Sequence, residues 1–160
     1  MKQSISNLED QLCEIHGKDY CVIVGNATLA IALILKVFNL KGKKIAIPNN
    51  VCVNVPMSVY FSGNNPKYLD ITQDDFGLDP SKLLDVIHEV DVVIAVHAYG
   101  MPCRIKEIER ICKNHNVLLI EDFCVAQGAK IDNINLGNFG DVSIVSFGSG
   151  KIVDVGHGGA

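Results

Sequence analysis

Polar residues with useful chemistry follow several apolar runs of this sequence. Residues 25–28 (Gly-Asn-Ala-Thr) open a helical pattern, and the free N–H groups and positive dipole end of such a helix favour a phosphate. Thr28 and Ser146 could add hydroxyl donors. Asp122 sits at the end of an apolar run, and Lys151 follows a glycine, which lets a ligand approach the amine closely.

Taken together, these groups match the needs of pyridoxal phosphate. The cofactor needs a lysine that forms a Schiff base with its aldehyde, a carboxylate that keeps its ring nitrogen protonated, and a cradle for its phosphate. Each residue alone has an ordinary explanation: Asp122 as a helix or turn cap, Lys151 as a solvated loop lysine, His97 as a core histidine. Only their placement at one edge of a sheet favours a binding site.

Two nucleotide-binding motifs fit less well. Residues 147–151 follow an apolar run as a P-loop does, but that motif requires Gly at position 145 and Ser or Thr at position 152. The chain has Val145 and Ile152 there. A Rossmann fingerprint needs three spaced glycines, and residues 25–30 lack two of them.

The elements that must position these groups alternate along the chain. A capping-box pattern at residues 6–9 predicts the start of a first helix that ends at Gly17. A buried strand is expected over residues 20–24, and a hairpin-like stretch is expected after the strand at 117–120. Further strands are predicted over 43–47, 66–71, 91–97, 117–120 and 142–147, and further helices over 29–38, 51–60, 79–88 and 104–115.

The predicted strands show no polar alternation and are separated by helices. That pattern predicts a three-layer α/β/α domain with a mostly parallel sheet covered on both faces. Ligands of such sheets bind beyond the carboxyl ends of the strands. The polar segments that fall there are residues 25–28, 49–50, 97, 121–122 and 146–151.

Composition limits the class of protein. The 160 residues are 48% apolar and 20% charged with a net charge of −4, which is typical of a globular domain and argues against nucleic acid as a partner. No run approaches the roughly 20 apolar residues of a membrane span, so no membrane partner is expected. The six cysteines lack CxxC or zinc-ligand spacing, which predicts no metal site and reduced thiols in a cytoplasmic protein.

Several motifs, in order, resemble the DegT-type nucleotide-sugar aminotransferases, a family of fold-type-I pyridoxal phosphate enzymes. Residues 97–102 are similar to the family's H-x-Y-G-x-P segment, and Glu121-Asp122 to its E-D-A-A-Q-A-H-G segment. Residues 137–151 resemble G-x-x-G-D followed by S-F-x-x-x-K, and residues 158–160 resemble the G-G-A that comes next. The resemblance covers nearly the whole chain from about Leu8.

The resemblance also implies roles for single residues. Lys151 matches the catalytic Schiff-base lysine, Asp122 the carboxylate at the pyridine nitrogen, and Ser146 a phosphate ligand. Cys52 stands where the family usually has an aromatic over the ring, and Val125 where it has Gln or His touching the ring hydroxyl; neither can do that job. The cofactor-binding residues implied in this way are Asn26, Ala27, Thr28, Cys52, Asp122, Val125, Ser146 and Lys151.

The function implied by the resemblance is transfer of an amino group from glutamate or glutamine to a nucleotide-linked keto-sugar. Such enzymes serve amino-sugar and surface-polysaccharide biosynthesis and act as homodimers. Family members that dehydrate the sugar replace the lysine with His, so Lys151 favours transamination.

The extent of the resemblance leaves an alternative open. Family members are longer, so residues 1–160 are expected to form part of the pyridoxal-phosphate-binding large domain, without the C-terminal small domain. A non-catalytic truncated or accessory module that pairs with another chain therefore remains the alternative, and whether this chain is an enzyme by itself stays open.

Overall fold

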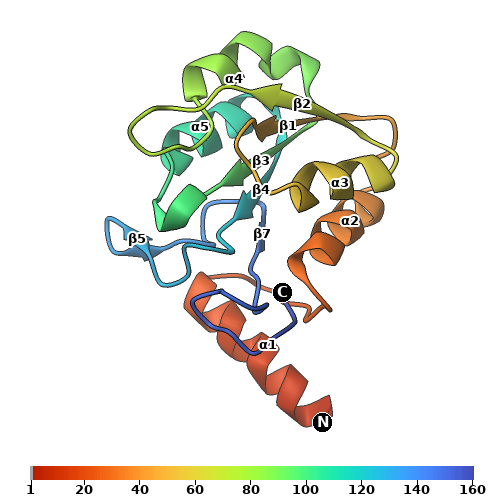
Figure 1. Ribbon diagram of the computed structural model, residues 1–160, viewed down its shortest axis with the longest axis vertical. Coiled ribbons are helices and arrows are strands. Elements are labelled where there is room, and N and C mark those ends of the chain that lie inside the picture. The colour runs from red at the N-terminus through yellow and green to blue at the C-terminus, as the bar shows by residue number, and fades with distance from the viewer. Residues whose placement is uncertain (1) are drawn as a thin grey trace.

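The structure, a computed structural model that describes residues 2–160, is built around a five-stranded parallel sheet (Figure 1). The strand order is β2-β1-β3-β4-β7, and each neighbouring pair is parallel. The strands are β1 (Lys44–Pro48), β2 (Asn65–Leu69), β3 (Val92–Val96), β4 (Leu118–Asp122) and β7 (Val142–Ile144). The predicted α/β class with a mostly parallel sheet is confirmed.

Helices cover both faces of this sheet. The helices α2 (Ala27–Val37) and α3 (Asn54–Phe61) pack on one face, and α4 (Pro80–Val86) and α5 (Ile105–His115) on the other. Single turns of 3-10 helix cover Ile87–Glu89 and Ala98–Gly100. Within residues 2–160, no helix is both long enough and apolar enough to cross a membrane.

Side chains of each strand alternate between two apolar cores. In β4, Leu119 lies in the core under α4 and α5, and Ile120 lies in the core under α2 and α3. Since successive residues of a strand point to opposite faces, both faces need apolar side chains. This double burial explains the continuous apolar runs in the sequence.

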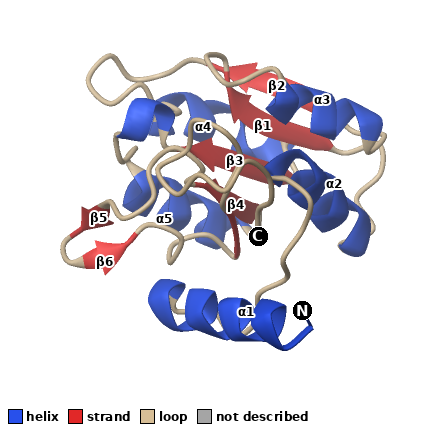
Figure 2. Ribbon diagram, turned by 60° about the horizontal axis from the view of Figure 1, so that its bottom comes forward, coloured by secondary structure: helices blue, strands red, loops and turns tan. Residues whose placement is uncertain are grey.

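The first helix, α1 (Lys2–His16), lies apart from the sheet (Figure 2). The prediction that this helix starts at the capping box is wrong. Ser6 lies inside the helix and not at its N-terminus, where a capping residue would bind the free N–H groups. The expected end of the helix is confirmed, with Gly17 in the left-handed region at φ 58°. The last turn docks on the hairpin β5 (Lys130–Ile131) and β6 (Ile134–Asn135), where Asn135 Nδ2 donates to Ile15 O at 2.9 Å.

The buried strand expected over residues 20–24 is not formed. Tyr20 is 90% exposed and Val22 is 67% exposed, and only Val24 is bridged, antiparallel to Gly159. The segment borders an apolar cavity beside β7 and does not pair with the edge of that strand. Since only one residue of this segment has a backbone partner, the apolar run does not become a strand.

Candidate active site

Asp122 is the last residue of β4 and lies buried at the carboxyl edge of the sheet. Strand alternation puts its side chain on the face of α2 and α3, together with Ile120. Its Oδ1 accepts a hydrogen bond from Cys124 N at 3.0 Å. Burial raises the pKa of Asp122, and the bond from Cys124 and the nearby Lys151 ammonium oppose this only in part.

Lys151 lies in the loop that follows β7 and is half-buried. Asp154 folds this loop, because its carboxylate accepts hydrogen bonds from Gly150 N and Gly156 N, both at 2.8 Å. Those two backbone donors lower the pKa of Asp154. No acidic side chain among residues 2–160 forms an ion pair with the Lys151 amine, so the amine remains available to a ligand.

Gln127 ties the lysine loop to the sheet. Its Nε2 donates to Ser146 O at 2.7 Å, and its Oε1 accepts from Val153 N at 3.2 Å. The sequence gives no local pattern for this role, since the partners lie 19 and 26 residues away. Gln127 therefore supports the site through two long-range hydrogen bonds, a role that the sequence patterns do not indicate.

The start of α2 offers free backbone donors. The Asn26 side chain caps the helix by accepting from Leu29 N at 2.8 Å. Within the described residues, the N–H groups of Ala27 and Thr28 have no acceptor, as expected for the first turn of a helix. These two N–H groups can bind an anion.

Gly159 brings the start of α2 and Ser146 together. The glycine pairs with Val24 on one side, where each N–H donates to the other residue's carbonyl, and bridges Ser146 on the other. A Cβ at position 159 would lie 2.7 Å from Val145 O and 3.0 Å from Ala27 N. Backbone therefore surrounds this position so closely that only glycine fits.

Cys52 and Val125 occupy ordinary positions. Cys52 is exposed in the turn before α3, and Val125 is half-buried after Cys124. A thiol has no aromatic face, and a valine has no hydrogen-bonding group. Neither residue can make the contact with the cofactor ring that the DegT-type family usually has at its position.

His97 and Glu121 lie at the same sheet edge but face away from Asp122. Both side chains are fully buried, with His97 Nε2 3.1 Å from Glu121 Oε1. His97 Nδ1 accepts from Cys103 N at 3.0 Å, so the ring proton is on Nε2 and is donated to Glu121. The core-histidine explanation of His97 is therefore correct.

The Glu121 carboxylate is saturated with donors. Besides His97, it accepts from the N–H groups of Gly137, Phe139 and Gly140 at 2.7 to 2.9 Å and from Ser143 Oγ at 3.4 Å. Burial acts to raise the pKa of Glu121, but the hydrogen bonds outweigh it and leave the pKa below its usual value. Glu121 is thus an ionised carboxylate held in the core.

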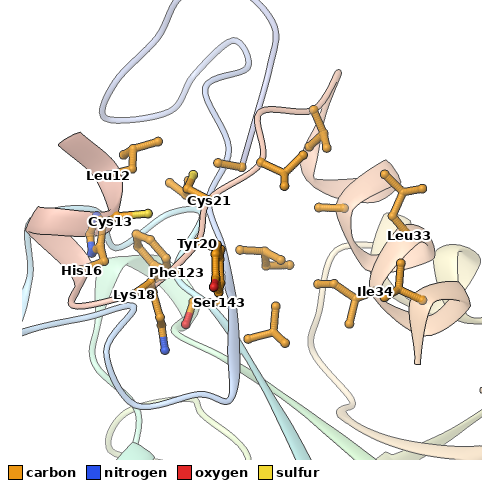
Figure 3. Close-up of a pocket in the computed structure, with 18 of the residues that line it drawn as sticks. Leu12, Cys13, His16, Lys18, Tyr20, Cys21, Leu33, Ile34, Phe123 and Ser143 are labelled. Carbon is orange, nitrogen blue, oxygen red and sulfur yellow. The ribbon is translucent and has the colours of Figure 1, made fainter. Parts of the chain in front are cut away.

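An apolar cavity of about 340 Å³ lies elsewhere, between α1, α2 and β7 (Figure 3). Its lining includes Leu12, His16, Leu33 and Phe123. None of the predicted site residues lines it. The candidate site is therefore the polar edge around Asp122 and Lys151, and not this cavity.

The residues at that edge fit pyridoxal phosphate. Asp122 is a buried carboxylate that accepts only one hydrogen bond from the described residues, which leaves capacity for a ligand donor. Lys151 supplies a free amine, and the backbone of Ala27 and Thr28 supplies anion donors. Cys52 and Val125 contribute no specific contact to this fit.

Comparisons with known proteins show which family the chain resembles. A sequence model of the DegT/DnrJ/EryC1/StrS aminotransferase family matches residues 2–160. GDP-perosamine synthase of Escherichia coli O157:H7 is 27% identical over 157 residues, which cover 97% of this chain and 43% of the relative. A dTDP-4-amino-4,6-dideoxy-D-glucose transaminase of Shigella dysenteriae is 30% identical over 154 residues, which cover 96% of this chain and 42% of the relative. The chain thus spans less than half the length of these relatives.

Solved structures share the fold. An aminotransferase from Psychrobacter cryohalolentis superposes with a TM-score of 0.93 at 26% identity, over 98% of this chain and 40% of that one. A GDP-4-keto-6-deoxy-D-mannose-3-dehydratase from E. coli with bound hydrated pyridoxal phosphate superposes with a TM-score of 0.89 at 23% identity, over 97% of this chain and 42% of that one.

Proposed function

We propose, from the premise that this chain belongs to the DegT/DnrJ/EryC1/StrS aminotransferase family, that residues 1–160 form the cofactor-binding part of an enzyme that aminates a nucleotide-linked keto-sugar. The observation that carries the proposal is the presence of two groups at one sheet edge. Asp122 is a buried carboxylate that accepts one hydrogen bond. Lys151, in the loop after β7, has an amine without an ion-pair partner among residues 2–160. The names of the relatives, a perosamine synthase and an amino-dideoxyglucose transaminase, support a sugar substrate.

The chain's own residues would divide the work. Pyridoxal phosphate, when bound, supplies an electron sink that stabilises charge at the substrate carbon. Lys151 would hold the cofactor and then, once displaced by the amino donor, carry a proton on its Nζ as the base. Asp122 would accept a hydrogen bond from the ring nitrogen and keep that nitrogen protonated, an interaction that a water-poor site strengthens. The N–H groups of Ala27 and Thr28 and the Ser146 hydroxyl would bind the phosphate.

The partners follow from the family. We propose glutamate or glutamine as the amino donor, a nucleotide-linked keto-sugar as the acceptor, and a homodimer as the working form. Donor and acceptor would react in turn, which gives ping-pong kinetics. The proposed pathway is amino-sugar and surface-polysaccharide biosynthesis in the cytoplasm.

Titration with pyridoxal phosphate tests the cofactor and the lysine together. The parent chain should develop a visible absorbance band, and borohydride reduction should fix the cofactor mass on the peptide that carries Lys151. Lys151→Ala should lose both signals, and Lys36→Ala, which changes an exposed lysine of α2, should keep them. An unchanged band in Lys151→Ala would show that the lysine assignment is wrong.

A second candidate function is a non-catalytic module that pairs with another chain. The exposed thiol of Cys52, in place of a ring-stacking aromatic, is the observation that favours it. Turnover of amino donor and sugar by the purified chain alone would exclude this candidate. Cofactor binding without turnover, together with a second co-purified chain that restores activity, would support it.

A further inference from the structure

We infer that Glu121 is a positioning residue, which fixes Asp122 from the opposite face of the sheet through a closed ring of hydrogen bonds with His97. The inference rests on the proposed function, because it assigns Asp122 the ring nitrogen as its partner. Glu121 itself faces the core under α4 and α5 and does not reach the proposed cofactor.

The ring joins the carboxyl ends of β3 and β4. His97 N donates to Asp122 O at 3.0 Å, and His97 Nε2 donates to Glu121 Oε1 at 3.1 Å. Glu121 and Asp122 are neighbours in the chain, so the two bonds and the peptide backbone close a loop. Asp122 cannot shift along or away from β3 without breaking one of these bonds.

Glu121 is itself immobilised from a third direction. Its Oε2 accepts from Phe139 N and Gly140 N at 2.8 and 2.9 Å, and its Oε1 accepts from Gly137 N at 2.7 Å. The loop wraps so tightly that a Cβ on Gly140 would lie 2.8 Å from Glu121 Cβ. The carboxyl end of β4 is therefore clamped between β3 and the loop before β7.

Pairing with β7 also holds the Asp122 backbone, but the Asp122 side chain has little else to hold its orientation. One N–H, from Cys124, donates to its carboxylate, and burial disfavours its charge. A desolvated carboxylate with one donor would relax toward other polar groups if its backbone could move. The clamp on Glu121 and the pairing with β7 together remove that freedom and keep the free oxygen available to a ligand.

Hydrogen exchange in the cofactor-free chain tests the ring directly. Glu121→Gln puts an amide NH₂ where backbone N–H groups now donate, which opens the clamp. We expect the His97 amide to exchange at least about tenfold faster, relative to core amides such as Ile94, because its acceptor Asp122 O is released. An increase of less than about twofold would overturn the inference.

A matched control removes a carboxylate that binds the other end of β4, from the residue before β7. Asp141 Oδ2 accepts from Leu119 N at 2.8 Å, near the amino end of β4. Asp141→Asn should speed exchange at Leu119 and leave His97 unchanged. Equal acceleration at His97 in both variants would reduce Glu121 to a general structural role. If Glu121→Gln does not fold, His97→Phe is the second variant. It removes both imidazole hydrogen bonds, to Glu121 and from Cys103 N, at similar volume. It should loosen Asp122 in the same way, seen as faster exchange at Cys124 N.

The loaded protein gives a second readout that stability alone would not move. With pyridoxal phosphate labelled with ¹⁵N in the ring, the parent should show the resonance of a protonated nitrogen. Glu121→Gln should shift it toward the unprotonated position and weaken cofactor binding about tenfold, whereas Asp141→Asn should do neither. An unshifted resonance in a folded Glu121→Gln protein would overturn the inference. A parent chain that binds no cofactor would refute the proposed function instead, and hydrogen exchange would still decide whether Glu121 positions Asp122.

Discussion

Glu121 and Asp122 are neighbouring carboxylates of β4 that lie on opposite faces of the sheet and have different surroundings. Glu121 accepts from His97, from three backbone N–H groups and from Ser143, and these bonds hold its pKa low against the effect of burial. Asp122 accepts one bond from Cys124, and burial raises its pKa. Burial alone therefore does not tell what a carboxylate does. The number of donors separates a carboxylate that holds the fold from one with capacity for a ligand.

Removal of Glu121 should have the largest effect on stability. Glu121→Ala leaves the His97 ring and three backbone N–H groups without an acceptor in the core, and we expect a loss of about 3–5 kcal/mol in the free energy of unfolding. Urea unfolding measures it. As a control, Glu109→Ala removes a surface ion pair with Lys113 and should cost less than about 1 kcal/mol. A loss below about 1 kcal/mol for Glu121→Ala would break the contrast between the two carboxylates.

A change at Gly159 tests the close approach of backbone groups at the start of α2. Gly159→Ala places a methyl group against Val145 O and Ala27 N, so we expect a loss of about 1–3 kcal/mol, because the pairing with Val24 must open. Thermal unfolding measures the loss. Gly25→Ala is the control, since its Cβ would meet only Leu29 Cδ2 at 4.0 Å and should change stability by less than half as much. Equal losses would contradict the close approach at Gly159.

Asp122 should behave in the opposite way to Glu121. At pH 7, Asp122→Asn removes a charge that burial disfavours, so stability should stay within about 1 kcal/mol of the parent or rise. The raised native pKa means that the parent gains stability as the pH falls through that value toward the unfolded pKa near 3.8. Any advantage of Asp122→Asn should therefore shrink on acidification. Urea unfolding between pH 7 and pH 4 checks this, and a growing advantage would refute the raised pKa.

In the same experiment, Glu121 makes stability depend on pH in the opposite direction. Its native pKa is lowered, so its contribution is complete above the unfolded pKa near 4.5 and is lost as the pH falls further. Asp122→Asn, which keeps Glu121, should therefore still lose stability below that pH. Full stability of this variant down to pH 3 would mean that Glu121 is not ionised in the core.

The exposed carboxylate Asp154 should give the smallest effect. Asp154→Asn weakens the acceptors of Gly150 N and Gly156 N, so these amides should exchange several-fold faster while the unfolding midpoint stays unchanged. Because the pKa of Asp154 is lowered, its carboxylate is protonated in the parent only below about pH 4, and the same loosening of the loop is expected there. Protected amides in the variant would show that the lysine loop is held by other contacts, such as Gln127.

The parts of the structure that follow from local pattern were predictable. The apolar runs of β1, β3 and β4 identify strands because both sheet faces are buried, and Pro80 after Asp79 marks the start of α4. The resemblance also pointed to Asp122 and Lys151, which the fold brings to one edge. Residues 20–24 were assigned wrongly because an apolar run does not reveal whether a neighbouring strand is present.

The division between Glu121 and Asp122 could not be read from the sequence. Two adjacent acids look alike until the strand's orientation and its distant partners are known, and the His97 ring that selects Glu121 lies 24 residues earlier. Only tertiary packing distinguishes Asp122, which we propose binds the ring nitrogen, from Glu121, which clamps the strand.

The pairing of Gly159 with Val24 has a consequence for the order of folding. The first and last thirds of the chain must meet before the start of α2 acquires its neighbours, whereas β1 to β4 can assemble from contacts much closer in sequence. Closing so long a loop costs conformational entropy that local contacts do not repay. During synthesis on the ribosome, the central strands should therefore form early, and the anion-binding turn should be among the last parts of the domain to reach its final conformation.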